Sequence, residues 1–210
     1  MTRRFITFEG IDGAGKSTHV APLAERLRAR GQHVVCTREP GGTPLAEALR
    51  ELLLHEPMDG VAETLLVFAA RRDHIERVIA PALERGETVL CDRFSDATFA
   101  YQGAGRGLDP TMLAEWNRAA TGGLVPDLTL LFDVPPQLGL ARRGSAAGEP
   151  NRLDLESEAF HTRVRECYLE LARGEPERFV VLDAAQSPEA LEARVWAAVS
   201  ARLPAEPARG

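Results

Sequence analysis

A glycine-rich segment near the amino terminus has the residue types and the spacing of a phosphate-binding loop. The segment is Gly10-Ile-Asp-Gly-Ala-Gly-Lys-Ser17, which fills every fixed position of the pattern G-x-x-x-x-G-K-[ST]. It lies between a predicted strand and a predicted helix, where backbone N–H groups and the positive end of the helix both face an anion. We therefore predict that a nucleoside triphosphate contacts Gly10, Ile11, Asp12, Gly13, Ala14, Gly15, Lys16, Ser17 and Thr18.

This loop also holds the single lysine of the chain. Lys16 is one of 25 basic residues, and all the others are arginine. A general preference for arginine would explain the excess, but not the one lysine that remains. In phosphate loops the lysine places a compact charge beside the β- and γ-phosphates, and the next hydroxyl, here that of Ser17, ligates magnesium.

Two arginines and a carboxylate are candidates for binding a second substrate that carries one phosphate. Arg38 follows the predicted strand His33–Thr37, and Arg93 follows the predicted strand Thr88–Cys91. Open α/β sheets bind ligands at the carboxyl ends of their strands, and guanidinium groups form forked hydrogen bonds to phosphate. Asp12 would be repelled by a triphosphate, so it either accepts a hydrogen bond from a hydroxyl group or faces solvent.

Two aspartates have the position of a magnesium-binding carboxylate. Asp92 follows Val89-Leu-Cys91, and Asp133 follows Leu130-Leu-Phe132. Each stands directly after an apolar strand, and carboxylate oxygens are ligands that Mg²⁺ prefers. We prefer Asp92, because an arginine adjoins it.

One helical pair could bind a nucleobase. Phe68 and Arg72 are four residues apart on a predicted helix and therefore share a face. An aromatic ring with a hydrogen-bond donor one turn away suits stacking on a pyrimidine and bonding to its carbonyl group. A core position is the competing interpretation of Phe68, and Tyr101-Gln102, beside a glycine-rich break, is not informative alone.

Short apolar segments alternate with helical patterns along the chain. Such alternation gives right-handed crossovers and a parallel sheet with helices on both faces. We predict an α/β fold in one domain over residues 1–210, a P-loop NTPase-type three-layer sandwich with a five-stranded parallel sheet. The predicted strands are Thr2–Glu9, His33–Thr37, Thr88–Cys91, Leu128–Val134 and Phe179–Leu182; the predicted helices include Ser17–Arg30, one from Pro44 capped by Thr43, Val61–Glu84, a broken stretch over Ser95–Thr121, and Pro188–Leu203.

Composition and charge exclude several classes of protein. The chain has 210 residues, 44% of them hydrophobic, and a net charge of −6. No apolar run is long enough to span a membrane, and the negative charge argues against binding to nucleic acid or anionic lipid. Cys36, Cys91 and Cys167 lack metal-site spacing and are predicted to be buried, reduced thiols of a cytoplasmic protein.

Among proteins with this loop, a small-molecule kinase is the most economical prediction. A regulatory GTPase normally carries an Asn-Lys-x-Asp motif, which a chain without a second lysine cannot have. Motor and transporter ATPases usually need longer chains. A P-loop protein that signals by its nucleotide state is the alternative from another class.

Five motifs, taken in order, resemble those of thymidylate kinases. The resemblance runs from Phe5 to about Ala184 and implies a bacterial enzyme that transfers the γ-phosphoryl group of ATP to dTMP, giving ADP and dTDP for dTTP synthesis. Another nucleoside monophosphate or deoxynucleoside kinase on the same fold is the nearest alternative. The motifs are Phe8-Glu-Gly-Ile-Asp-Gly-Ala-Gly-Lys-Ser-Thr18, Thr37-Arg-Glu-Pro-Gly-Gly-Thr43, Phe68-x-x-x-Arg72, Asp92-Arg-Phe94 and Tyr101-Gln-Gly103.

The resemblance implies how the acceptor nucleotide is held. The residues matching Arg38 and Arg93 grip the phosphate of dTMP, and the match to Asp12 bonds the 3′-hydroxyl. The match to Phe68 stacks on thymine, and the match to Arg72 bonds its O4. Further substrate-binding positions are Thr98 at the base edge, Tyr101 where a ring excludes a ribose 2′-hydroxyl, Gln102, and Pro40, whose counterpart often follows a cis peptide bond.

The family also divides by the source of its transition-state arginine. One type carries it in the P-loop, at the position of Gly13, and the other supplies basic residues from a mobile lid. The segment over residues 142–152, with Arg142, Arg143 and Arg152, resembles such a lid. The expected catalytic residues are therefore Lys16, Arg93, Arg142 and Arg152, with Arg142 also near the adenine; the resemblance further implies a cytoplasmic homodimer, and residues 204–210 are predicted to be a flexible tail.

Overall fold

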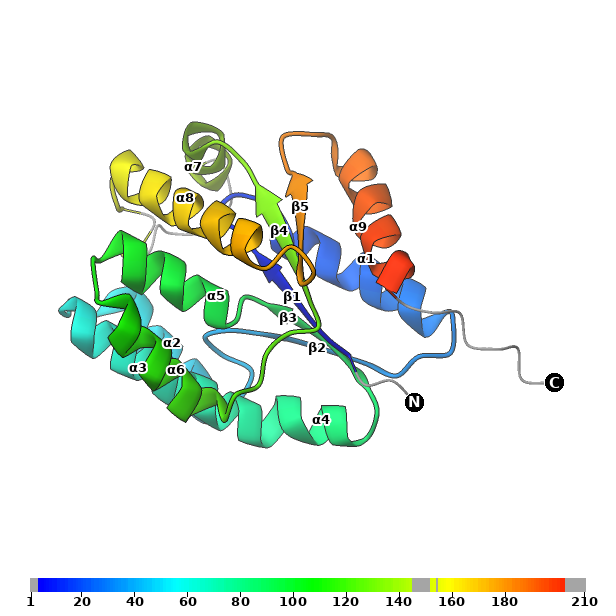
Figure 1. The fold of residues 1–210 in the computed structure, drawn as a ribbon, viewed down its shortest axis with the longest axis horizontal. Coiled ribbons are helices and arrows are strands. Elements are labelled where there is room, and N and C mark those ends of the chain that lie inside the picture. Colours follow the sequence, from blue (N-terminus) through cyan, green and yellow to red (C-terminus); the bar gives the residue numbers. More distant parts are fainter. Residues whose placement is uncertain (1–3, 145–151, 154, 203–210) are drawn as a thin grey trace.

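The computed structural model describes residues 4–144, 152–153 and 155–202, which form a five-stranded parallel sheet with helices around it (Figure 1). The strand order is β2-β3-β1-β4-β5. All five predicted strands are confirmed, each within 2 residues of its predicted bounds. The strands are β1 (Arg4–Glu9), β2 (Val34–Arg38), β3 (Thr88–Asp92), β4 (Leu128–Asp133) and β5 (Phe179–Asp183).

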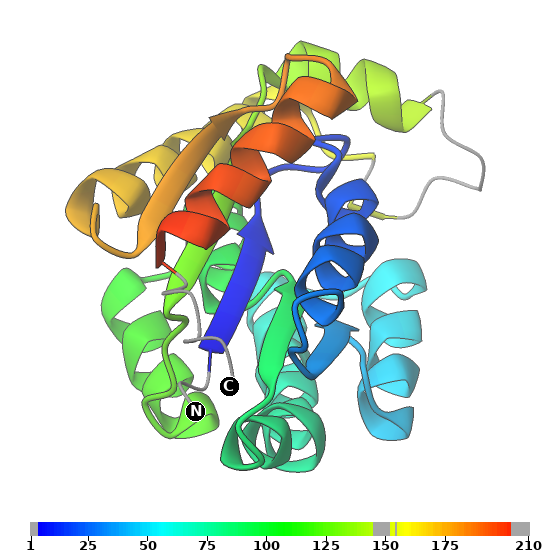
Figure 2. The same cartoon turned by 90° about the vertical axis from the view of Figure 1, so that its right-hand side faces the viewer.

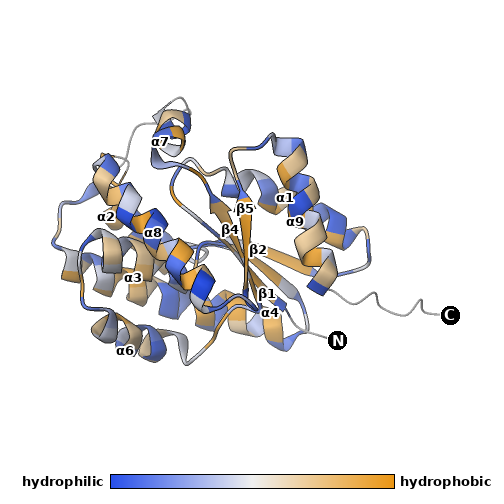
Figure 3. Cartoon of the chain, turned by 45° about the horizontal axis from the view of Figure 1, so that its top comes forward, coloured by the Kyte–Doolittle hydropathy of each residue, from blue (hydrophilic) through white to orange (hydrophobic). Residues whose placement is uncertain are grey.

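β1 is the central strand, between β3 and β4 (Figure 2). Its Phe8 lies opposite Asp92 of β3, and its Glu9 lies opposite Leu131 of β4. The strands are mostly hydrophobic along their whole length (Figure 3), as expected for a parallel sheet that is buried on both faces. Because the three strands end at the same edge, the loop after β1 lies beside the residues that follow β3 and β4.

Helices cover both faces of the sheet (Figure 1). α1 and α9 lie together on one face, whereas α8 and the helical region between β2 and β4 lie on the other. The helices are α1 (Lys16–Arg28), α2 (Pro44–His55), α3 (Gly60–His74), α4 (Ala80–Glu84), α5 (Ser95–Thr98), α6 (Pro110–Thr121), α7 (Pro136–Gly144), α8 (Glu158–Gly174) and α9 (Pro188–Arg202).

Two predicted helical stretches contain π-helical turns. The helix predicted over Val61–Glu84 is interrupted by η1 (Ile75–Ile79), and α5 continues into η2 (Phe99–Gly105). Such turns are common at functional sites, because they redirect the side chains that follow. The predicted start of α2 is confirmed, since the Thr43 side chain accepts a hydrogen bond from the Ala46 N–H.

The structure corrects the prediction for two of the three cysteines, and two predicted segments lie outside the described residues. Cys91 is buried as predicted, but Cys36, on the edge strand β2, is exposed, and Cys167 is partly exposed. None of the described helices is long and apolar enough to cross a membrane. Residues 145–151 of the predicted lid and the predicted tail, 204–210, lie outside the described residues.

α7 was not predicted, and it packs closely on the phosphate loop. The contact is made by Gly139, where a Cβ atom would lie 2.8 Å from the carbonyl oxygen of Asp12 and 2.9 Å from Cδ1 of Ile11. The Asp12 oxygen belongs to the backbone, so a side chain at position 139 would require the backbone to move. Gly139 therefore allows α7, which carries Arg142, to approach the loop.

We expect Gly139→Ala to lower the free energy of unfolding by about 1–3 kcal/mol, because it overpacks this contact. Chemical denaturation would measure the change. The matched control is Gly144→Ala in the same helix, where a Cβ atom meets nothing within 4 Å. Equal stability of the two variants would contradict a close contact between α7 and the loop.

Candidate active site

Lys16 lies across the loop that carries it. Its Nζ donates hydrogen bonds to the carbonyl oxygens of Gly10 (3.1 Å) and Ile11 (2.9 Å), and the side chain is buried. Burial, followed by the charge of Arg93, lowers the pKa of Lys16 to about 8. The buried ammonium group has lost most of its contact with water and is held by neutral carbonyl oxygens. Anionic phosphate oxygens would stabilise its charge more strongly than these carbonyl oxygens do.

Ser17 and Asp92 meet beside the loop. Ser17 Oγ donates a hydrogen bond to Asp92 Oδ2, which joins the first turn of α1 to the end of β3. The pair offers a hydroxyl and a carboxylate oxygen, both hard ligands that suit Mg²⁺. Asp133 is instead held by Arg165, which donates from Nε (2.6 Å) and Nη2 (2.9 Å). These contacts support Asp92 rather than Asp133 as the candidate ligand.

A cavity of about 120 Å³ opens beside the loop. Its wall includes residues that follow β1, β2 and β3 and residues of α2, α3, α5 and η2, so segments far apart in the sequence meet there. The bond between Glu39 and Pro40, in the loop after β2, is cis. The predicted site residues in the wall are Asp12, Pro40, Arg93, Thr98, Tyr101, Gln102 and Arg152.

Arg93 and Asp12 form an ion pair in this wall. Arg93 Nη2 donates to Asp12 Oδ1 at 2.7 Å, and the hydroxyl group of Tyr101 donates to Asp12 Oδ2 at 2.8 Å. Burial alone would raise the pKa of Asp12, but the charges of Arg93 and Lys16 hold that pKa well below its usual range. Arg93 has a φ of 72°, in the left-handed region that a non-glycine residue adopts at an energetic cost.

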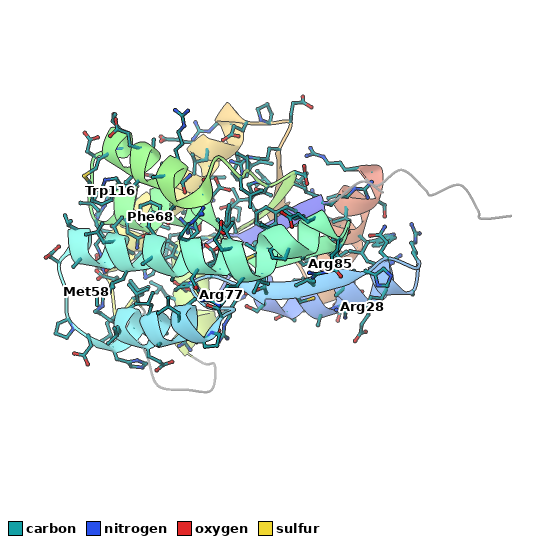
Figure 4. All side chains as sticks on the ribbon, turned by 90° about the horizontal axis from the view of Figure 1, so that it is seen from below. Arg28, Met58, Phe68, Arg77, Arg85 and Trp116 are labelled. Atoms are coloured by element: carbon teal, nitrogen blue, oxygen red, sulfur yellow. The ribbon has the colours of Figure 1, made fainter. Side chains whose placement is uncertain are left out.

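The structure places Phe68 and Arg72 outside the cavity wall. The ring of Phe68 packs edge-to-face on Trp116 of α6, with centroids 6.3 Å apart (Figure 4). Arg72 forms an exposed ion pair with Glu76, at 2.6 Å. These two residues, predicted to bind the base, therefore do not line the cavity in this structure, because α3 packs on α6 and their face is turned away from it.

The residues one position earlier, Val67 and Arg71, line the cavity instead. Arg71 donates from Nε to Glu39 (2.7 Å), from Nη1 to Thr98 Oγ1 (3.0 Å) and from Nη2 to the carbonyl oxygen of Phe94 (3.0 Å). Adjacent helical residues differ by about 100° around the axis. Val67 and Arg71 are also four residues apart, so helical spacing alone could not distinguish the two pairs.

Arg38 also lies outside the cavity wall. Its Nη2 pairs with Glu47 of α2 at 2.8 Å, and its side chain is 54% exposed. Arg50, further along α2, lines the cavity and donates to the carbonyl oxygen of Pro40 at 3.0 Å. Burial, and then the charge of Arg38, lowers the pKa of Arg50. No sequence pattern indicated Arg50, because it stands inside a helix and belongs to none of the motifs.

The two candidate lid arginines are placed differently. Arg142, near the end of α7, donates to the carbonyl oxygen of Ala184 at 2.7 Å, just after β5. Arg152 pairs with the buried carboxylate of Glu63 at 2.7 Å and donates to the carbonyl oxygen of Leu53 at 2.9 Å. In this structure Arg152 therefore contacts α2 and α3 rather than the phosphate loop.

A family model for thymidylate kinase matches residues 8–195 of this chain. The chain belongs to the thymidylate kinase family. It is accordingly an ATP-dependent nucleoside monophosphate kinase, and the predicted family and fold class are confirmed.

Individual relatives agree with this assignment over most of the chain. The thymidylate kinase of Burkholderia vietnamiensis is 57% identical over 188 residues, which cover 88% of this chain and 91% of the relative. That of Cupriavidus metallidurans is 59% identical over 187 residues, covering 89% and 92%. The crystal structure of thymidylate kinase from Ehrlichia chaffeensis superposes with a TM-score of 0.79 at 33% identity, covering 95% of this chain and 100% of that one.

This member of the family has no room for an arginine at position 13 of its loop. A Cβ atom on Gly13 would lie 2.0 Å from the carbonyl oxygen of Gly139, and the residue has a φ of 75°. An arginine near the transferred phosphoryl group must therefore come from another segment. Arg142 and Arg152 remain the candidates.

Binding of MgATP to this kinase should be accompanied by proton uptake at alkaline pH. With a pKa of about 8, Lys16 loses its proton as pH rises through 8, and phosphate oxygens restore the charged form. The uptake should be about 0.8 proton at pH 8.5 and about 0.1 at pH 7. Titration calorimetry in two buffers of different ionisation enthalpy measures it, and a binding enthalpy independent of buffer at pH 8.5 would contradict the lowered pKa.

Proposed function

We propose that this kinase transfers the γ-phosphoryl group of ATP to dTMP, with the residue roles given below. The observation that carries the proposal is the position of Arg93, whose guanidinium group lies in the cavity wall and bonds both Gly10 and Asp12 of the phosphate loop. A monophosphate bound by Arg93 would thus stand next to the γ-phosphate held by the loop. In-line transfer needs this adjacency more than it needs a base, because a phosphate oxygen is already anionic.

On the donor side, Lys16 and the loop N–H groups hold the β- and γ-phosphates. Ser17 and Asp92 would hold Mg²⁺, which neutralises charge on the transferred group when it is bound. Arg142 would lie near the adenine of ATP. Arg152 supplies charge at the transition state only if its guanidinium group leaves Glu63.

On the acceptor side, Arg93 and Arg50 bind the phosphate, and Asp12 accepts a hydrogen bond from the 3′-hydroxyl group. The Tyr101 ring fills the space that a ribose 2′-hydroxyl would need. Its hydroxyl group already bonds Asp12 and Arg93, which supports a fixed ring position. Arg38 reaches the phosphate only if it exchanges its exposed partner, Glu47.

The base would lie against Val67, with Arg71 and Thr98 at its edge. Arg71 Nη1 and Nη2 each carry two N–H groups and each donate one hydrogen bond to a described residue, so a second N–H remains for a base carbonyl. Gln102 is turned toward Glu63, to which its Nε2 donates at 2.7 Å.

The enzyme is proposed to work as a cytoplasmic homodimer. Exposed apolar side chains on α2 and α3 support an interface between two copies, since Leu52, Val61 and Leu65 are each more than 40% exposed. Small-molecule substrates are the proposed partners otherwise, with no nucleic acid and no membrane.

The test is ADP release from MgATP with each monophosphate supplied in turn. We expect turnover with dTMP, weaker or absent turnover with dUMP, and no turnover with UMP, dCMP, dGMP or thymidine. If another nucleotide is preferred, the proposed roles of the donor-side residues still hold, but the proposed contacts to the base are wrong. ATP binding without turnover for any acceptor would instead favour a nucleotide-state switch.

Arg71 and Arg72 provide a matched pair of variants. We expect Arg71→Lys to raise KM for dTMP by about tenfold, because lysine keeps the charge but loses the forked donors. Arg72→Ala, on the exposed side of α3, should change KM less than twofold. Steady-state kinetics at saturating ATP measures both, and the reverse order would restore Arg72 as the base contact.

A further inference from the structure

Tyr168, on α8, contacts Arg93 from the interior of the protein. The residue is 1% exposed, and its hydroxyl group accepts a hydrogen bond from Arg93 Nη1 at 3.2 Å. The same hydroxyl group donates to Oε2 of Glu9 at 2.8 Å. A tyrosine has a single hydroxyl proton, so donation to Glu9 leaves the oxygen lone pairs for Arg93.

The two terminal nitrogens of Arg93 have different surroundings. Nη1 donates to Tyr168 and to the carbonyl oxygen of Gly10 (2.8 Å), neither of which lines the cavity. Nη2 donates to Asp12 (2.7 Å) and to the hydroxyl group of Tyr101 (3.0 Å), which both line it. One end of the guanidinium group is thus anchored in the protein, and the other faces the space for the acceptor.

Glu9 connects this anchor to the backbone that carries Arg93. Glu9 is fully buried, and its Oε1 accepts a hydrogen bond from the N–H of Phe94 at 2.6 Å. The same carboxyl group therefore holds both the hydroxyl group of Tyr168 and the peptide unit after Arg93. Because Arg93 has the left-handed φ of 72°, this peptide unit needs such a partner to keep its direction.

We propose that Tyr168 is a positioning residue: its hydroxyl group, oriented by Glu9, anchors Nη1 of Arg93 so that Nη2 points at the phosphate of the acceptor. The proposal rests on the role given to Arg93 under the proposed function. Planar guanidinium–phosphate bonding depends on orientation, so a rotation of the fork weakens binding and misplaces the attacking oxygen. Removing one neutral hydrogen bond elsewhere in α8 has no such consequence.

The first experiment compares two ligands that differ only in the phosphate. Tyr168→Phe keeps the ring and removes the hydroxyl group. We expect the Kd for dTMP to rise about tenfold, as for loss of a hydrogen bond to a charged group, and the Kd for thymidine to change less than twofold. Calorimetry measures both, with Thr162→Val as the control, because the Thr162 hydroxyl bonds only the Glu158 carbonyl of its own helix among the contacts described.

Two results would overturn the proposal. Equal weakening of dTMP and thymidine binding would mean that the hydroxyl group supports the cavity as a whole rather than Arg93. An unchanged Kd for dTMP, with wild-type kcat, would mean that Gly10 alone anchors Nη1. A melting temperature close to that of Thr162→Val confirms that neither result reflects misfolding.

Arg93→Gln separates this proposal from the function on which it rests. If this variant keeps the preference for dTMP over thymidine, Arg93 does not bind the phosphate, and both ideas fail. If it loses the preference while Tyr168→Phe keeps it, only the role of Tyr168 fails. In the double variant, Tyr168→Phe should have no further effect, because it acts through Arg93.

Discussion

The ion pair between Arg93 and Asp12 is the interaction on which the site depends. A protein that binds several phosphate groups must bury cations at one edge of its sheet and still fold when the phosphates are absent, and an unpaired buried charge is costly. Asp12 neutralises Arg93 there. Lys16 is instead held by two carbonyl oxygens, and burial lowers its pKa, which makes its charged form easier to lose. Each of these internal partners can be exchanged for a ligand oxygen, so the same contacts that stabilise the free protein prepare it for substrate.

Much of the candidate donor site could be predicted from the sequence, because it is local. The phosphate loop, the lysine and the following hydroxyl lie within eight consecutive residues, and a strand and a helix of the expected type flank them. The preference for Asp92 over Asp133 used only an adjacent arginine, and the contact of Asp92 with Ser17 agrees with it. The five strands were predictable for the same reason, since each is a short apolar run that ends at a turn.

The acceptor site was less predictable, because it depends on which way helices face. Helical spacing shows that two residues share a face but not what that face meets, so Phe68 with Arg72 and Val67 with Arg71 fitted equally well. In this structure the packing of α3 on α6 leaves Val67 and Arg71 at the cavity, and no local pattern encodes that packing. Tyr168 shows the limit most clearly, since it lies 159 residues from Glu9 in the sequence and is joined to it by one hydrogen bond.

The position of Arg152 is compatible with a role at the donor side because of how Glu63 is neutralised. Removing the single partner of a buried carboxylate costs several kcal/mol, about 3–5 in measured cases. Glu63 has a second cation, Arg106 Nη2 at 3.2 Å, and a hydrogen bond from Gln102. If Arg152 left for the γ-phosphate, Glu63 would keep Arg106 as its counter-ion. The carboxylate of Glu63 therefore stays paired with a cation when Arg152 leaves it.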